Sequence, residues 1–230
     1  MENIKINDRL MTAVPLVREG ARLADIGTDH AYLPIYLLEQ GKIAYAIAAD
    51  INRGPLDKAN ENITKYGLGD KIDTVLCDGL VKIHADQVDD IAIFGMGGEL
   101  IVKIIDEAPW LKDCKKRLIL QPMTHPEKLR EYLAQNGFEI INEALSLDRG
   151  KIYQTVCAEY DGQKRSFDRF TLLFGEYIIA NGGALFAQLL QATKKQLARK
   201  IDGKMAGNEN VEYEEKLLAE IENYIERIKL

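Results

Sequence analysis

The stretch Leu23-Ala-Asp-Ile-Gly-Thr-Asp-His-Ala-Tyr-Leu-Pro34 decides the fold of this 230-residue chain. It begins with a short apolar run, turns at Gly27 and continues into a segment typical of a helix start. A strand, a glycine turn and a helix N-terminus form a common nucleotide-cofactor site, because glycine lets the backbone approach a ligand and the helix offers free N–H groups. We therefore expect a strand over residues 21–26, a helix over 31–40, and a ligand at the turn between them.

Strands and helices alternate on the C-terminal side of this turn. A continuous apolar run predicts a strand buried on both faces over residues 43–49, and further strands are predicted over residues 72–76, 91–94 and 117–120, separated by helices. Residues 138–147 and 153–160 then predict two consecutive strands joined as a hairpin. Alternation requires a mostly parallel sheet, and the hairpin adds an antiparallel strand. This α/β pattern is that of a Rossmann-like class I methyltransferase sheet, whose last strand is antiparallel. Helical spacing also predicts an N-terminal helix over residues 7–19, with Pro15 as a possible kink.

The pattern becomes entirely helical after Gly162. One apolar stripe runs from Phe170 to Ile178, and it ends at Asn181-Gly182-Gly183. Two longer helices are predicted over residues 185–201 and 211–230, the second with its stripe ending at Ile228. Because the loop between them is short, they predict an antiparallel helical hairpin with coiled-coil packing. We expect a cofactor-binding domain over residues 1–162 and a helical domain over residues 163–230.

The composition is that of an ordinary globular protein, with 47% hydrophobic and 29% charged residues. The net charge of −6 argues against general nucleic-acid binding over the whole surface. The three cysteines have no metal-ligand spacing, so neither a metal site nor a disulfide framework is expected. No apolar run approaches the roughly 18 residues of a membrane span, and no signal pattern is seen. A cytoplasmic protein without a membrane segment is expected.

Acidic residues follow three successive predicted strands. Asp25 lies at the end of the first, Asp50 at the end of the second and Asp78 just after the third. In open α/β sheets, ligands bind outside the carboxyl ends of the strands, and an acid about 20 residues beyond the glycine turn accepts hydrogen bonds from ribose hydroxyls. Asp78 is placed to accept from an adenine amine. Helix capping is the alternative role for Asp50 and Asp78.

Two cofactors compete for this site, a nicotinamide dinucleotide and S-adenosylmethionine. A dinucleotide site needs room for phosphates, but Asp29 and Tyr32 occupy the second and third glycine positions of its motif. An aspartate aimed at a pyrophosphate repels it, whereas a cationic sulfonium tolerates carboxylates. The charge of the turn therefore favours S-adenosylmethionine.

Five motifs occur in an order that resembles a known family. They are Asp25-Ile-Gly-Thr-Asp-His-Ala-Tyr-Leu-Pro34, Cys77-Asp-Gly-Leu80, Gly95-Met-Gly-Gly98, Leu120-Gln-Pro122 and Lys151-Ile-Tyr153. With the helical tail, they resemble the bacterial tRNA (adenine-N1)-methyltransferases that modify position 22. Met123 departs from the family's pattern, which has Asn there.

The resemblance implies S-adenosylmethionine as methyl donor, tRNA as acceptor and no metal. It implies a cofactor pocket lined by Asp25, Gly27, Thr28, Asp29, His30, Asp50, Ile51, Asp78, Gly79, Gly95 and Met96. Adenine N1 carries a lone pair in the neutral base, so the enzyme's main task is to place the reacting atoms in line. We expect the residues around the adenine to be Asp29, His30, Tyr32, Gly95, Met96, Gly97 and Gln121.

A basic run in the helical tail is the candidate RNA contact. It consists of Lys194, Lys195, Arg199, Lys200 and Lys204, and a solvated helix face is the alternative interpretation. Three other functions remain open from the sequence: a small-molecule methyltransferase with the tail as a lid, a non-catalytic tRNA- or protein-binding module, and a dehydrogenase.

Overall fold

A computed structural model describes residues 4–228 of the chain, and the side chain of Ile228 lies outside the described part, as do residues 229–230. The sheet has seven strands in the order β3-β2-β1-β4-β5-β7-β6. Five of them, β1 to β5, run parallel, and β7 pairs antiparallel with both β5 and β6. This confirms the predicted class I methyltransferase plan. The strands are β1 Ala21–Ile26, β2 Ile43–Asp50, β3 Ile72–Leu76, β4 Asp90–Met96, β5 Arg117–Pro122, β6 Phe138–Asp148 and β7 Lys151–Tyr160.

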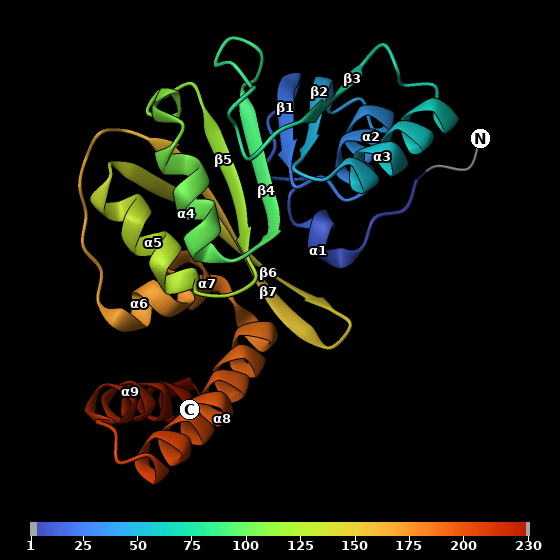
Figure 1. The fold of residues 1–230 in the computed structure, drawn as a ribbon. Coiled ribbons are helices and arrows are strands. Elements are labelled where there is room, and N and C mark those ends of the chain that lie inside the picture. Colours follow the sequence, from blue (N-terminus) through green and yellow to red (C-terminus); the bar gives the residue numbers. More distant parts are fainter. Residues whose placement is uncertain (1–3, 229–230) are drawn as a thin grey trace.

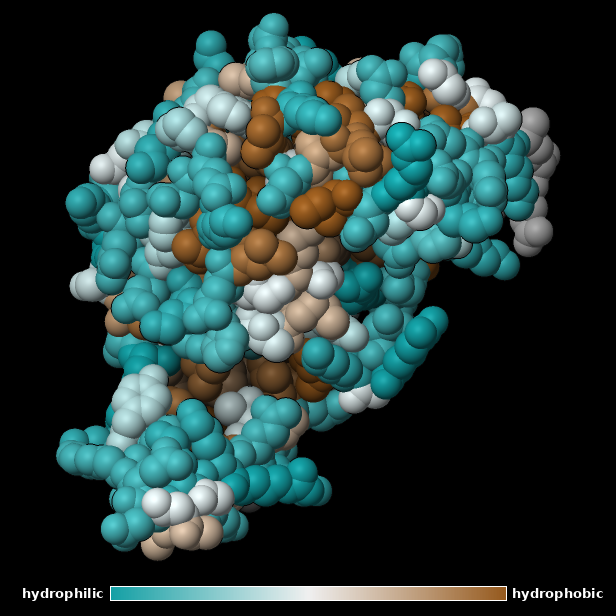
Figure 2. Space-filling model, viewed as in Figure 1, coloured by the Kyte–Doolittle hydropathy of each residue, from teal (hydrophilic) through white to brown (hydrophobic). Residues whose placement is uncertain are grey.

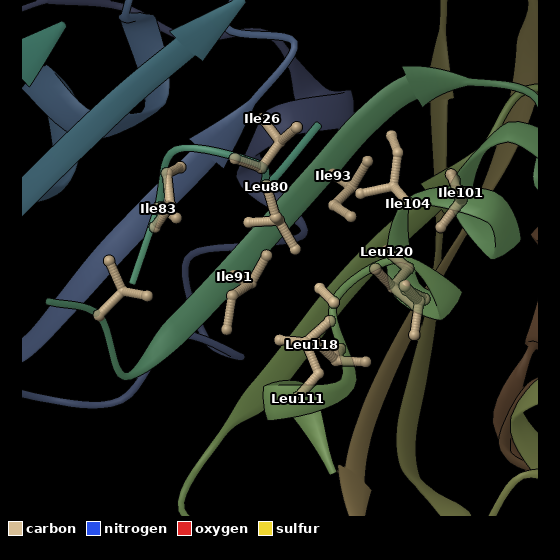
Figure 3. Packing of buried hydrophobic residues seen from close by; sticks show 14 of the residues in the cluster. Ile26, Leu80, Ile83, Ile91, Ile93, Ile101, Ile104, Leu111, Leu118 and Leu120 are labelled. Atoms are coloured by element: carbon tan, nitrogen blue, oxygen red, sulfur yellow. The ribbon is translucent and has the colours of Figure 1, made fainter. Parts of the chain in front are cut away.

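Helices cover both faces of this sheet (Figure 1). One face packs against α2 (Tyr32–Glu39) and α3 (Arg53–Lys65), and the other packs against α4 (Gly98–Asp106) and α5 (Pro126–Gln135). A short 3₁₀ helix, η1 (Pro109–Leu111), adds Leu111 to the second core. Figure 3 shows Ile91 and Ile93 of β4 in that core, with Ile93 close to Ile104 of α4. The continuous apolar runs are explained by this burial on both faces.

The N-terminal helix is much shorter than predicted. Only α1 (Asp8–Met11) is helical, with the Asn7 side chain accepting a hydrogen bond from Leu10 N at its start. Turns occupy residues 12–16, with Leu16 N bonded to Ala13 O at 2.9 Å. Proline has no N–H and clashes with the preceding helical turn, so Pro15 ends the helix where the sequence pattern allowed only a kink.

The C-terminal stripe of apolar residues is divided into two helices instead of one. These are α6 (Arg169–Phe174) and α7 (Glu176–Asn181), separated by Gly175 at φ +85°. A Cβ at Gly175 would lie 2.1 Å from the carboxylate oxygens of Glu143, so the chain can pass Glu143 only with glycine here. The break at Gly175 therefore depends on a residue of β6, which the local pattern does not contain.

The last two helices, α8 (Gly183–Ala206) and α9 (Glu212–Ile228), pack against each other. Lys194 pairs with Glu222 while Lys204 pairs with Glu214, so the two helices run antiparallel, as predicted. The α8 helix continues five residues beyond the predicted end at Ile201, and this shortens the connecting loop. Their shared core lies beside Leu145 of β6.

The helices α6 to α9 lie beyond the carboxyl ends of the parallel strands, at the end of the sheet where the β6–β7 hairpin also projects (Figure 1). Figure 2 shows apolar atoms in the recess between these helices and the rest of the molecule. None of the helices within residues 4–228 combines the length and apolar composition that a membrane span requires.

Candidate active site

The turn after β1 is built around Gly27, which has φ +73°. Its N–H and that of Thr28 both donate to Ala49 O of β2, at 2.8 and 2.9 Å. A Cβ at Gly27 would lie 2.4 Å from Cε of Met96, which belongs to the end of β4. The turns after β1 and β4 therefore meet, and glycine is required by the positive φ and by the close approach.

Asp25 is buried beneath this turn, where Thr28 Oγ1 donates to its carboxylate at 2.6 Å. Burial raises the pKa of Asp25 to about 6 against the opposing effect of the Thr28 hydrogen bond. The carboxylates of Asp29 and Asp50 also raise it, whereas the guanidinium of Arg9 lowers it. This concentration of negative charge suits a cationic ligand and disfavours a phosphate.

His30 and Ala31 follow in the left-handed region of backbone space, with φ values of +62° and +56°. Two consecutive non-glycine residues there are uncommon, and such strain is typical of functional sites. Asn62 Nδ2 of α3 supports the turn by donating to His30 O at 2.9 Å. The His30 ring stacks on Tyr32, with centroids 5.3 Å apart and planes inclined by 6°. His30 Nε2 also lies 3.2 Å from a carboxylate oxygen of Asp29, which is exposed.

The acids of the next two strands lie on the same edge of the sheet. Asp50 pairs in register with Leu76, and its backbone carbonyl accepts from Cys77 N at 3.0 Å. One oxygen of its side chain accepts from Asn52 N at 2.7 Å, and the neighbouring Ile51 is exposed. Asp78 follows on the surface, and Gly79 packs closely against Ile104 with φ +52°. Parallel pairing thus brings the predicted acids of β1, β2 and β3 to adjacent strand ends.

The turn from Gly95 to Gly98 leads from β4 into α4, and Gly95 is exposed whereas Gly98 is buried. Gly95 has φ +79°, and the pairing of β4 with β5 is irregular between Phe94 and Met96. Gly98 N donates to Thr124 O at 2.8 Å, and a Cβ at Gly98 would lie 2.3 Å from His125 O. Of the predicted adenine-contacting residues, Gly95, Met96 and Gly97 therefore lie next to the Gly27 turn and offer backbone groups as donors and acceptors.

Gln121 does not face this site, contrary to the sequence-based expectation that it contacts adenine. It is fully buried, and its Nε2 donates to Thr155 Oγ1 at 2.8 Å and to Arg9 O at 3.1 Å. Gln121 thereby ties α1 to β5 and β7. Its Oε1 atom has no hydrogen-bond partner within the described part of the protein. Side chains alternate along β5, so Gln121 lies on the face of the sheet that α1 covers. Gln121 therefore acts as a positioning residue.

One residue beside the site, Arg9, was not identified from the sequence. Arg9 Nη1 lies 3.8 Å from Met123 Sδ, and a Cβ at Gly95 would lie 3.5 Å from the same nitrogen. The guanidinium therefore borders the Gly95 turn. Arg9 belongs to a short helix with no motif, so no local signal indicates its position.

The predicted basic run on α8 is largely neutralised by α9. Lys194 pairs with Glu222 at 2.8 Å, while Lys200 and Lys204 both pair with Glu214 at 3.0 and 2.7 Å. Hydrogen bonds from Lys204 and Lys200 lower the pKa of Glu214 to about 2. The two remaining cations are Lys195 and Arg199, which are exposed one helical turn apart.

Comparisons with known proteins agree with this geometry. A family model described as tRNA (adenine(22)-N(1))-methyltransferase matches residues 23–229. A Bacillus subtilis (strain 168) protein named tRNA (adenine(22)-N(1))-methyltransferase is 36% identical over 190 residues, which cover 81% of this chain and 80% of that protein.

Solved structures resemble the chain over almost its whole length. The structure of a Streptococcus pneumoniae putative tRNA (m1A22) methyltransferase in complex with S-adenosyl-L-methionine has a TM-score of 0.86 at 32% identity, covering 96% of this chain and 100% of that one. An M. capricolum relative in complex with S-adenosyl-homocysteine has a TM-score of 0.79 at 26% identity, covering 96% and 98%.

Proposed function

The chain belongs to the tRNA (adenine(22)-N(1))-methyltransferase family, and from this premise we propose how its residues transfer a methyl group from S-adenosylmethionine to adenine N1 in tRNA. The observation that carries the proposal is the meeting of the Gly27 and Gly95 turns above the buried carboxyl group of Asp25. This arrangement joins an acidic cofactor site to a turn that begins at the exposed Gly95.

The residues present fit S-adenosylmethionine. When bound, this cofactor supplies a methyl group on a positively charged sulfur atom. Asp25 and Asp29 provide the negative charge that a sulfonium and its amino-acid tail favour. Asp50 is placed to accept from ribose hydroxyls, since one of its carboxylate oxygens is left after the bond from Asn52 N. Asp78, beyond the adjacent strand, suits the adenine amine.

The acceptor needs placement more than activation. Neutral adenine has a lone pair on N1, so no residue is required to remove a proton before methyl transfer. The polypeptide from Gly95 to Gly98 contains no side-chain hydrogen-bond acceptor that would hold an exocyclic amine. Its backbone groups suit a ring nitrogen and the adjacent base edge. Holding N1 in line with the methyl group contributes most to the rate.

The stacked pair His30 and Tyr32 supports entry of the base. N1 lies on the Watson–Crick edge, so the adenine must leave its pairing and stacking partners before it reacts. The half-buried rings of His30 and Tyr32 beside the Gly27 turn offer replacement stacking. Asp29, exposed and close to His30, is placed to stabilise the positive charge that develops on the methylated base.

The test is mass spectrometry of tRNA nucleosides after incubation with the protein and S-adenosylmethionine. We expect N1-methyladenosine as the product, and loss of most activity in Asp29→Ala even when S-adenosylmethionine is saturating. Ser166→Ala is the matched control, because Ser166 is exposed in the segment that follows the sheet. Methylation of small molecules alone, or an unmodified tRNA, would contradict the proposal.

The exposed cations of α8 are the proposed distal contact with tRNA. Lys195 and Arg199 form no salt bridge within residues 4–228, unlike the other three basic residues of the run. Charge reversal at both positions should weaken tRNA binding and reduce its salt dependence without changing cofactor affinity.

We further propose that residues 1–162 and 163–230 are separate domains, since residues 170–225 contribute a core of their own beside Leu145. The family's substrate makes the cytoplasm the expected compartment.

A further inference from the structure

A cation–aromatic cluster lies at the carboxyl end of the sheet, and the proposed function assigns it no step. It consists of Arg9 in α1 and of Lys151 and Tyr153 in β7. The guanidinium carbon of Arg9 lies 5.6 Å from the centroid of the Tyr153 ring, and Lys151 Nζ lies 5.3 Å from the same centroid. Both distances are within the range of cation–π attraction. One aromatic ring therefore holds two cations from elements far apart in the chain.

The cluster borders the Gly95 turn. Arg9 Nη1 is 3.8 Å from Met123 Sδ and would be 3.5 Å from a Cβ at Gly95. The backbone of Arg9 is held in place by the buried Gln121 side chain, which donates a hydrogen bond to the carbonyl oxygen of Arg9. The guanidinium is thus held at the edge of the place where an acceptor base approaches, and it acts electrostatically on the buried Asp25.

Among the described residues, the cations of the cluster form no salt bridge, although Asp148 pairs in register with Lys151 and Arg9 acts on the buried Asp25. Within residues 4–228, no carboxylate pairs with Arg9, Arg149 or Lys151. The hairpin that carries Arg149 and Lys151 projects beyond the sheet, at the same end as α8 (Figure 1), and both residues are exposed. Unpaired cations that face solvent beside a nucleotide site bind phosphate groups, and they release counterions when they do so.

We propose that Arg9 and Lys151, held by Tyr153, bind the RNA backbone phosphates next to the target adenine. The inference rests on the proposed function. An adenine that approaches the Gly95 turn brings its own phosphates, because the backbone of RNA follows every base. Arginine is suited to this position since its planar guanidinium binds a phosphate with two parallel hydrogen bonds. The cluster thus contacts the nucleotides near the reaction, and α8 contacts more distant ones.

The experiment measures the affinity of the full-length protein for unmodified tRNA as a function of salt concentration, at pH 8. Each of Arg9→Gln and Lys151→Gln should weaken binding about tenfold. Each should also reduce the magnitude of the slope of log K against log salt by about 1. Lys164→Gln is the matched control, because Lys164 is exposed beyond the opposite end of β7. It should leave affinity and slope unchanged.

Calorimetry with S-adenosylmethionine separates this proposal from the proposed function. Lys151→Gln should bind the cofactor with unchanged affinity. Arg9→Lys should recover part of the tRNA affinity that Arg9→Gln loses, because lysine keeps the charge but not the two parallel hydrogen bonds. The phosphate site is wrong if the wild-type protein forms N1-methyladenosine while both Gln variants keep the wild-type affinity and slope. If the wild type methylates no tRNA, the proposed function fails, and the binding slopes still decide the phosphate site independently.

Discussion

The buried ion pair between Arg130 and Glu143 allows a quantitative test of how the C-terminal helices are attached. Arg130 Nε donates to Glu143 Oε1 at 2.7 Å, and both side chains are at most 1% exposed. The remaining Arg130 nitrogens donate to Gln154 Oε1 at 2.8 Å and to the backbone carbonyls of residues 172–174 at the end of α6. Glu143 in turn accepts from Tyr177 N at 3.1 Å. One guanidinium therefore connects α5, β6, β7 and α6.

Replacing Arg130 with Met keeps an unbranched side chain but removes every one of these donors. The carboxylate of Glu143 is then buried without its partner, and loss of one member of such a pair typically costs about 3–5 kcal/mol. This is a large part of the roughly 5–15 kcal/mol by which folded domains are stable. We expect urea unfolding, followed by circular dichroism, to show a decrease of that size in the free energy of unfolding.

Two further variants make the reasoning refutable. Combining Arg130→Met with Glu143→Leu removes the unpaired charge and should recover part of the lost stability. Lys128→Met on the same helix breaks only an exposed pair with Glu131, and it should change stability by less than about 0.5 kcal/mol. A loss below about 1 kcal/mol in Arg130→Met, or a double variant less stable than the single one, would refute the assignment of the pair as a buried connection.

The other predictions concern the glycine turns and Asp25. Burial raises the pKa of Asp25 to about 6 in the folded chain, above its unfolded value, so this group's contribution to stability is lost as pH rises through about 4 to 6. Urea unfolding at pH 4.5 and pH 7 should therefore show Asp25→Asn gaining about 2 kcal/mol relative to wild type at the higher pH; an equal difference at both values would contradict the shift. Gly27→Ala places a Cβ at φ +73° and 2.4 Å from Met96 Cε, and calorimetry should show more than a tenfold loss of S-adenosylmethionine affinity. In thermal unfolding, Gly98→Ala should lower the midpoint because its Cβ meets a backbone carbonyl at 2.3 Å, whereas Gly54→Ala in open space should leave it unchanged or raise it.

Much of the sheet was predictable because the composition of a strand reflects how its two faces are buried. The run from Ile43 to Ala49 is apolar at every position, which is typical of a strand covered on both faces. The predicted strand over residues 72–76 coincides with β3. The N-terminal helix was overextended, since helical spacing continues past Pro15 although the missing N–H ends the helix there.

The candidate site was predictable where chain order and sheet order agree. Asp25, Asp50 and Asp78 follow successive parallel strands, so the parallel pairing of β1, β2 and β3 necessarily brings them to one edge. Gln121 also follows a strand, but a residue at a strand end can point to either side of the sheet. Its burial under α1 depends on packing that no pattern along β5 records.

The sequence by itself determined the fold, the acidic edge and the two glycine turns, because these depend on composition and on spacing within a few residues. Tertiary structure alone decided which cations remain free. Three lysines of α8 are neutralised by acids of α9, whereas Arg9 of α1 contacts Tyr153 of β7, which lies far along the chain. Pairing between charges depends on distances in space, and residues remote in the chain become neighbours only after the chain has folded.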